Sequence, residues 1–236
     1  MKTQMYTLLF FFLFVQSASA HASLTQPIDF SKHQIVKVSL EAVEKSFVPS
    51  PAKGSKIEQD DFAELLTWQS KRTDAQCKIA VDEAAIATVY SAFGPDYKIL
   101  DAKQTQELAK IMSTAVNEEI DYIRSLKDYY KRPRPYDANS QIHPCAKKET
   151  TLAYPSGHAA ISRFIAHALS AADPANSKKY FARADEVALN RVLGGVHHPS
   201  DIAAGKVFAD YFWQQCEQSS EFHKSLLALT LALKKI

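Results

Sequence analysis

The chain has 236 residues, of which 46% are hydrophobic, and it carries a formal net charge of +2. This is the composition of an ordinary globular protein, and the length favours a single domain. The small net charge argues against general nucleic-acid binding, which depends on a strongly basic face.

The first twenty residues, 1–20, are predicted to be a secretory signal peptide. Lys2 provides a positive start, Tyr6–Val15 is an almost unbroken apolar run, and Ala18-Ser19-Ala20 is a cleavage site of the small-x-small type. The alternative is an uncleaved membrane anchor, but the apolar run is too short to span a bilayer comfortably. We therefore expect a secreted protein.

Two further regions are predicted along the rest of the chain. Residues 21–55 are irregular and rich in proline, and we expect an extended N-terminal arm. In residues 56–236 the apolar positions recur mostly at spacings of three and four, which is typical of amphipathic helices. The expected helices are 60–68, 79–93, 105–130, 157–172, 178–193, 200–215 and 222–233. Because no alternating β-branched run is present, we expect an all-α fold, a single-domain helical bundle.

The chain contains three cysteines, Cys77, Cys145 and Cys216. Secretion would place them in an oxidising compartment, where at most one internal disulfide can form among three thiols. Their spacing alone does not decide the pair. We expect Cys77 to pair with Cys145, because that bridge would tether the polar loop that contains Cys145. None of the three lies in a Cys/His metal pattern, so no metal site is expected.

Positive charge is concentrated where the helix expected over residues 105–130 ends. Lys127 and Arg134 flank this end, and Pro133 and Pro135 prevent the helix from continuing. An arginine can bind two phosphate oxygens at once, and a lysine adds a point charge. The alternative is a solvated basic helix end, which also suits the helix dipole.

A second polar segment, Ser156-Gly157-His158, opens an apolar helix. Ser156 is a suitable N-cap, and the free N–H groups of a helix start favour bound anions. Gly157 leaves room for a close ligand, and His158 would project from the first turn beside it. The alternative is an ordinary helix start with a surface histidine.

The third segment runs from Arg191 to Asp201. Asp201 can accept a hydrogen bond from one ring nitrogen of His197, which leaves the other nitrogen free as a nucleophile or base. Gly194 and Gly195 permit a sharp turn between Arg191 and His197. The alternative is a surface His–Asp pair in a loop between helices.

Together these segments read Lys-x6-Arg-Pro, Pro-Ser-Gly-His and Arg-x5-His-x3-Asp, which resembles the signature of the type 2 phosphatidic acid phosphatase superfamily. That superfamily includes class A bacterial non-specific acid phosphatases, lipid phosphate phosphatases and vanadium haloperoxidases. The signal peptide and size resemble the soluble bacterial class A branch, and this resemblance implies the bacterial periplasm as the location. Two departures are visible, since Asn190 replaces the usual serine and Leu152-Ala153-Tyr154 replaces a glycine- or serine-rich lead-in. We expect them to affect the support of the site and the subclass, not the reaction.

The resemblance implies a phosphate-binding set. Lys127, Arg134 and Arg191 would neutralise the phosphate, while the Ser156 hydroxyl and the Gly157 amide would donate hydrogen bonds to it. Such groups also stabilise the charge of a pentavalent transition state.

The resemblance also implies the catalytic roles. His197 would attack phosphorus, Asp201 would orient it, and protonated His158 would give its proton to the leaving alcohol. No cofactor or metal is expected, because three cationic side chains take the place of a metal ion.

The expected function is therefore a secreted, vanadate-inhibited acid phosphatase that hydrolyses small phosphate monoesters through a phosphohistidine intermediate. A lipid phosphate phosphatase at a membrane surface and a vanadate-dependent haloperoxidase are the enzymatic alternatives, and a helical anion-binding protein is the non-enzymatic one. The sequence leaves the natural substrate open. It also leaves the oligomeric state open, although the soluble branch often forms homo-oligomers.

Overall fold

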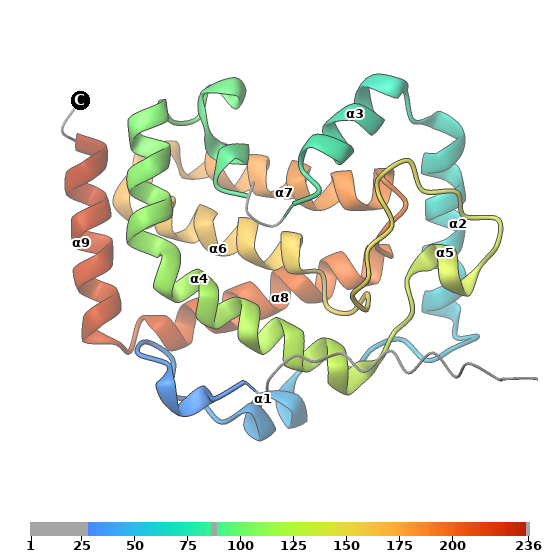
Figure 1. Ribbon diagram of the computed structural model, residues 1–236, viewed down its shortest axis with the longest axis horizontal. Helices are drawn as coiled ribbons and strands as arrows, with labels where there is room; N and C mark the ends of the chain where they lie inside the picture. The colour runs from blue at the N-terminus through green and yellow to red at the C-terminus, as the bar shows by residue number, and fades with distance from the viewer. Residues whose placement is uncertain (1–27, 86–88, 235–236) are drawn as a thin grey trace, which may run out of the picture.

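The computed structural model describes residues 28–85 and 89–234, and these residues form helices and loops without any strand. The expected all-α fold is thereby confirmed. The predicted signal peptide lies outside the described residues. The α-helices are α1 (Leu40–Ser46), α2 (Lys56–Lys71), α3 (Asp74–Asp82), α4 (Ala102–Tyr130), α5 (Pro135–Ala138), α6 (Gly157–Ala172), α7 (Ser177–Leu193), α8 (Pro199–Cys216) and α9 (Ser220–Lys234) (Figure 1). Short 3-10 turns are η1 (Phe30–Lys32), η3 (Ser91–Phe93), η4 (Pro95–Tyr97) and η5 (Pro174–Asn176).

Helix α6 forms the centre of the bundle. Its residues are mostly apolar or small on every side, and Ile161, Phe164 and Leu169 are fully buried. Helices that are apolar nearly all round are typical of a protein core. α6 packs chiefly against α7 and α8, and it also contacts α4 and α9. Figure 1 shows α4 crossing in front of α6, with α7 above it.

The long helix α4 carries one end of the site. Asp101 and Gln104 form a capping box that starts it, and a one-sided apolar face packs into the core. The helix ends where Lys131 adopts the left-handed conformation with φ of 51°, just before Pro133. The expected end of this helix is therefore correct, and it places Lys127 in the last turn.

The helix expected over 79–93 is wrong in both its start and its end. α3 begins earlier, because Thr73 and Gln76 form a capping box, and it ends at Asp82. The next residue, Glu83, binds Arg183 and accepts a 2.8 Å hydrogen bond from Asn190. These bonds to α7 hold the chain in a turn that the local apolar spacing does not indicate.

The segment expected as an extended arm is not wholly extended. Within its described part it forms η1 and α1, the latter capped by the Ser39 hydroxyl. Between the two, the Glu118 carboxylate on α4 accepts hydrogen bonds from the backbone N–H groups of Gln34, Ile35 and Val36. This buried carboxylate fastens the arm to α4. The division of the chain at residues 20 and 55 remains a prediction.

The cysteines link α3 to the loop that follows α5. Cys77 and Cys145 form a disulfide with Cα atoms 5.7 Å apart, which is the pair expected from the sequence. Cys216 is a free, buried thiol at the end of α8. In the described part of the chain, every helix is too short or too polar to cross a bilayer.

Candidate active site

The three sequence segments meet around one cavity. The end of α4, the start of α6 and the turn between α7 and α8 converge there, although 74 residues separate Lys127 from Asp201. The cavity has a volume of about 320 Å³. Its wall includes Lys127, Arg134, Gly157, His158 and His197, with Ala84, Ala85, Ile120, Ile123, Arg124, Glu149, Thr151 and Ile161 completing it.

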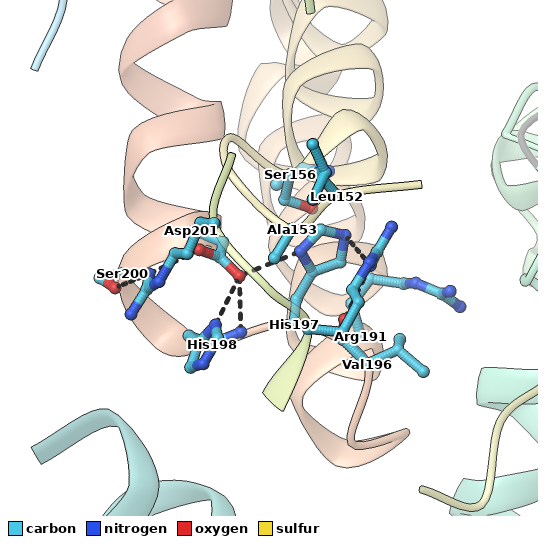
Figure 2. Close-up of polar contacts among 12 residues, drawn as sticks. Leu152, Ala153, Ser156, Arg191, Val196, His197, His198, Ser200 and Asp201 are labelled. Atoms are coloured by element: carbon cyan, nitrogen blue, oxygen red, sulfur yellow. Dashed lines mark hydrogen bonds and ion pairs between the residues drawn. The ribbon is translucent and has the colours of Figure 1, made fainter. Parts of the chain in front are cut away.

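His197 is held between a carboxylate and a guanidinium. Its Nδ1 lies 3.2 Å from Oδ2 of Asp201, and its Nε2 lies 2.9 Å from Nη1 of Arg134 (Figure 2). Because a guanidinium has only donors, Nε2 must accept this hydrogen bond, and the ring proton must then lie on Nδ1. Nε2 therefore carries a lone pair at the cavity. Burial, followed by the charge of Arg134, lowers the pKa of His197 well below its ordinary value despite Asp201.

The turn before His197 depends on two glycines. Gly195 adopts φ of 75°, a conformation that costs glycine little, and the amides of Val196 and His197 both donate to the Arg191 carbonyl. A Cβ on Gly194 would lie 3.0 Å from the Asn190 carbonyl. The chain thus reverses tightly enough to bring His197 back beside the end of α7.

Asp201 is completely buried and accepts hydrogen bonds from three residues. Besides His197, these are the backbone and Nδ1 of His198 at 2.8 and 3.0 Å, and Nη1 of Arg132 at 2.6 Å. Figure 2 shows the carboxylate between the two imidazole rings. Burial alone would raise the pKa of Asp201, but the hydrogen bonds from His197 and His198 hold it well below its ordinary value. The carboxylate is therefore ionised.

Arg132 and Asp61 were missed in the sequence analysis. Nη2 of Arg132 lies 2.8 Å from Asp61, which also accepts a 2.9 Å hydrogen bond from the Ser200 amide. Arg132 therefore links Asp61 on α2 to Asp201, because each of these buried carboxylates binds one of its terminal nitrogens. Its only signal in the sequence is a further arginine in an already basic helix end, and Asp61 gives none.

His158 lies in the first turn of α6 and is nearly buried. Its Nε2 has no hydrogen-bond partner among the residues that the structure describes. Burial, followed by the charges of Arg191, Arg134 and Lys127, lowers the pKa of His158 well below its ordinary value. The ring of the free protein is therefore harder to protonate than an ordinary histidine.

Lys127 is buried at the cavity wall beside the loop that precedes α6. Its Nζ donates to the carbonyls of Leu152 at 2.6 Å and Ala153 at 3.2 Å. Burial, helped by the charge of Arg134, lowers the pKa of Lys127 to about 7. Its positive charge is thus easily lost near neutral pH.

Ser156 and Arg191 are fully buried and do not line the cavity. Ser156 caps α6, where its hydroxyl accepts a 3.4 Å hydrogen bond from the Ala159 amide, and its own amide donates to the Asp201 carbonyl at 3.0 Å. Nη1 of Arg191 donates to the Ala80 carbonyl at 3.1 Å. Its Nε has no partner in the described ranges 28–85 and 89–234. Both residues support the site from behind its wall.

A carboxylate that the sequence analysis did not consider lies within this cationic group. Oε1 of Glu149 is 2.7 Å from Nη2 of Arg191, and Oε2 is 3.8 Å from Nη2 of Arg134. The residue lies in a polar loop, where a lone glutamate gives no functional signal. Only the course of the loop over the end of α7 brings it to the arginines.

Proteins of similar sequence include bacterial acid phosphatases. Residues 108–216 match the PAP2 superfamily. The chain is 29% identical over 187 residues to a non-specific acid phosphatase of Providencia stuartii, covering 75% of both chains. It is 26% identical over 204 residues to an acid phosphatase of Zymomonas mobilis subsp. mobilis, covering 82% of this chain and 74% of that one.

Two solved structures share the fold. One is a bacterial vanadium-dependent iodoperoxidase, with a TM-score of 0.57 and 16% identity over 74% of this chain. The present chain spans about half of it, 52% of its length. The other is a transmembrane PAP2-type phosphatidylglycerolphosphate phosphatase from Bacillus subtilis, with a TM-score of 0.51 and 17% identity over 76% of this chain and 89% of that one. At these identities the likeness concerns the fold alone.

Proposed function

We propose, from the match of residues 108–216 to the PAP2 superfamily, that the protein is a secreted acid phosphatase that hydrolyses small phosphate monoesters through a phosphohistidine. The observation that carries the proposal is the placement of His197. Its Nε2 carries a lone pair at a cationic cavity, while ionised Asp201 holds the opposite ring nitrogen.

The cavity suits a phosphate group. Lys127 and Arg134 provide positive charge at its wall, and the start of α6 provides the amides of Gly157 and His158 together with the helix dipole. The unpartnered Nε of Arg191 is a further donor close behind the wall. These donors are fixed before the substrate arrives, so they can stabilise the developing charge of the transition state without reorganisation.

In the first step Nε2 of His197 attacks phosphorus, and the bond from phosphorus to the ester oxygen breaks. His158 delivers a proton from Nε2 to the leaving alkoxide, so the alcohol departs neutral. In the free protein, burial and then the surrounding cations lower the pKa of this ring and disfavour its protonated form. A bound phosphate dianion offsets those cations and favours the protonated ring. Asp201 stabilises the positive charge that forms on the His197 ring.

In the second step a water molecule attacks the phosphohistidine. Neutral His158 takes the proton from the water, the phosphorus–nitrogen bond breaks, and His197 recovers its lone pair. The products are inorganic phosphate and the enzyme with His158 protonated, as in the substrate complex, and the ring returns this proton to solvent when the phosphate leaves. We propose that no metal ion takes part, since Lys127, Arg134 and Arg191 supply the positive charge that a metal would bring.

The size of the cavity indicates the class of substrate, and the first residues of the chain indicate the location. A volume of about 320 Å³ suits a phosphate with a small alcohol as leaving group. Residues 1–20 have the pattern of a secretory signal peptide, so we propose export to the periplasm. Vanadate takes up the geometry of the transition state, and it is expected to inhibit tightly.

The test compares His197→Ala and His158→Ala on an alkyl and an activated aryl phosphate. His197→Ala should be inactive on both, whereas His158→Ala should keep slow turnover of the aryl ester only, because only a strong leaving group departs without a proton. Label from radioactive substrate should be trapped on His197 by an alkaline quench, and EDTA should leave turnover unchanged. The control is His223→Ala, exposed on α9. Label on a serine or aspartate, or loss of activity in EDTA that a metal restores, would overturn the proposal.

A further inference from the structure

The Glu149 carboxylate lies beside two arginines of the expected phosphate-binding set, Arg191 and Arg134. Its two carboxylate oxygens face Arg191 at 2.7 Å and Arg134 at 3.8 Å. Both arginines are buried, whereas the Glu149 side chain remains 24% exposed. A carboxylate that bridges two guanidinium groups resembles a phosphate in the way it satisfies them. In the free protein, Glu149 thus neutralises part of the cationic group.

The backbone of Glu149 is fixed, and its side chain is the part that can move. The Tyr136 hydroxyl accepts from the Glu149 amide at 2.9 Å and donates to its carbonyl at 3.1 Å. Earlier in the loop, the amides of Cys145 and Ala146 both donate to the Gly194 carbonyl, and the disulfide adds a covalent tether. Movement of the carboxylate therefore requires rotation of one side chain and no rearrangement of the loop.

A second cavity, beside the one that contains His197, offers another position for the Glu149 carboxylate. Glu149 lines the cavity that contains His197, and it also lines an adjacent cavity of about 330 Å³. That neighbouring cavity is bordered by Lys147, Lys148 and Thr150. A carboxylate that leaves the arginines can enter a space with two other cations, so its charge stays compensated.

We propose that Glu149 is an internal competitor for the phosphate group. It holds Arg191 and Arg134 in the empty site, rotates toward Lys147 and Lys148 when a phosphate binds, and returns to displace the phosphate product. This inference rests on the proposed function and assigns Glu149 the setting of KM and of product inhibition. The opposite role is purely structural, in which Glu149 is needed to hold Arg191 in place.

The two roles predict opposite results for Glu149→Gln. If the carboxylate competes, its removal should lower the inhibition constant of inorganic phosphate and KM, each roughly tenfold, from the usual net strength of a hydrogen bond between charged groups. The turnover number kcat should not rise, because phosphate then leaves more slowly. Unchanged or weaker phosphate binding would overturn the proposal and assign Glu149 the structural role.

The matched control is Glu186→Gln. Glu186 also pairs with a buried arginine, Arg183, at 2.9 Å, but it lies on α7 outside the cavity. Its replacement should leave phosphate binding unchanged. A second variant, Glu149→Ala, covers the case in which the glutamine of Glu149→Gln still bridges the two arginines. It should tighten phosphate binding at least as much as Glu149→Gln does.

Calorimetric titration with inorganic phosphate separates this inference from the proposed function, because it needs no turnover. If wild-type protein hydrolyses no monoester but Glu149→Gln still binds phosphate more tightly, the proposed function fails and the competition stands. If wild-type protein hydrolyses monoesters and neither Glu149 variant binds phosphate more tightly, the competition fails and the proposed function stands.

Discussion

At the scale of single residues, burial lowers the pKa of three side chains of the site. Burial, followed by the charges of Arg134 and Lys127, lowers the pKa of both His158 and His197, and Arg191 adds to the effect on His158. The same burial and a neighbouring guanidinium bring the pKa of Lys127 to about 7. The charge of the site near neutral pH therefore depends on Lys127, whose ordinary pKa is far higher.

Lys127 should make anion binding depend on pH. Below pH 7 the side chain is charged, and as pH rises through its pKa of about 7 the charge is lost, so affinity for an anion should fall. Sulfate is the suitable probe, because it keeps two negative charges throughout. Calorimetry of wild-type protein between roughly pH 6 and 8 should show this decline, and Lys127→Arg should make it shallower because an arginine keeps its charge.

The control for this measurement is Lys110→Arg, which lies exposed on α4 and should retain the decline. A bound dianion also favours protonated His158, and this contribution to the decline is the same in wild-type protein and in both lysine variants. The part of the decline that Lys127→Arg removes therefore belongs to Lys127. Sulfate affinity that stays constant across neutral pH in wild-type protein would contradict the assignment to Lys127.

At the scale of elements, the end of α3 and the residues that follow it form part of the cavity wall and of its support. The Ala80 carbonyl accepts from Arg191, and Ala84 lines the cavity just beyond the end of the helix. Two connections hold this end in place. Glu83 binds Arg183 and Asn190 on α7, and Cys77 is joined to Cys145 in the loop that carries Glu149. The side-chain amide of Asn190 thus has its partner in the residue that follows α3.

Removal of the disulfide should destabilise the protein and let α3 move relative to the loop that carries Glu149. The double variant Cys77→Ser/Cys145→Ser opens a loop with a sequence separation of 68. In the entropic model such a loop contributes about 4 kcal/mol to the free energy of unfolding. Urea unfolding should show a loss of this order, and kcat/KM should fall because the loop moves relative to Arg191.

Treatment of wild-type protein with dithiothreitol serves as the comparison. It should reproduce the lower stability of the double variant and should not affect the variant further. Equal unfolding free energies of wild-type protein and the double variant would contradict the stabilising role of this bridge.

At the scale of the whole molecule, one acidic side chain lies within the apolar core. Glu119 on α4 is fully buried, and neither of its carboxylate oxygens has a hydrogen-bond partner within the described residues. Burial raises the pKa of Glu119 well above its ordinary value, so the folded protein keeps it neutral. In the unfolded chain the same group ionises from about pH 4.3 upward.

Glu119 should therefore make the stability of the fold decline with rising pH. Its contribution is fully present below about pH 4.3 and is lost as pH rises toward the pKa of the folded state, by up to about 1.4 kcal/mol per pH unit. Glu119→Gln removes this dependence. Urea unfolding of wild-type protein and variant at several pH values should show a difference that grows toward pH 8 in favour of the variant.

Glu217→Gln is the matched control for this comparison, because Glu217 is exposed at the end of α8. Its stability should follow that of wild-type protein at every pH. A constant difference between Glu119→Gln and wild-type protein across the range would show that Glu119 does not titrate with unfolding.

The sequence alone determined the helical class of the fold, the long helix that ends before Pro133, and the helix start at Ser156. These features depend on signals within a few residues, namely apolar spacing, prolines and caps. The sequence also indicated which three segments to compare, because the types and spacings of their polar residues match one chemistry.

Only the tertiary structure decided the end of α3, the contacts of Arg132 with Asp201, and the position of Glu149 between Arg191 and Arg134. It also decided the direction in which the pKa of His197 moves, since a carboxylate and an arginine act on that ring in opposite directions. Each of these features depends on residues that are far apart in the chain and meet only through packing. Local patterns identify groups able to react, but the charges and hydrogen bonds that control them come from the fold.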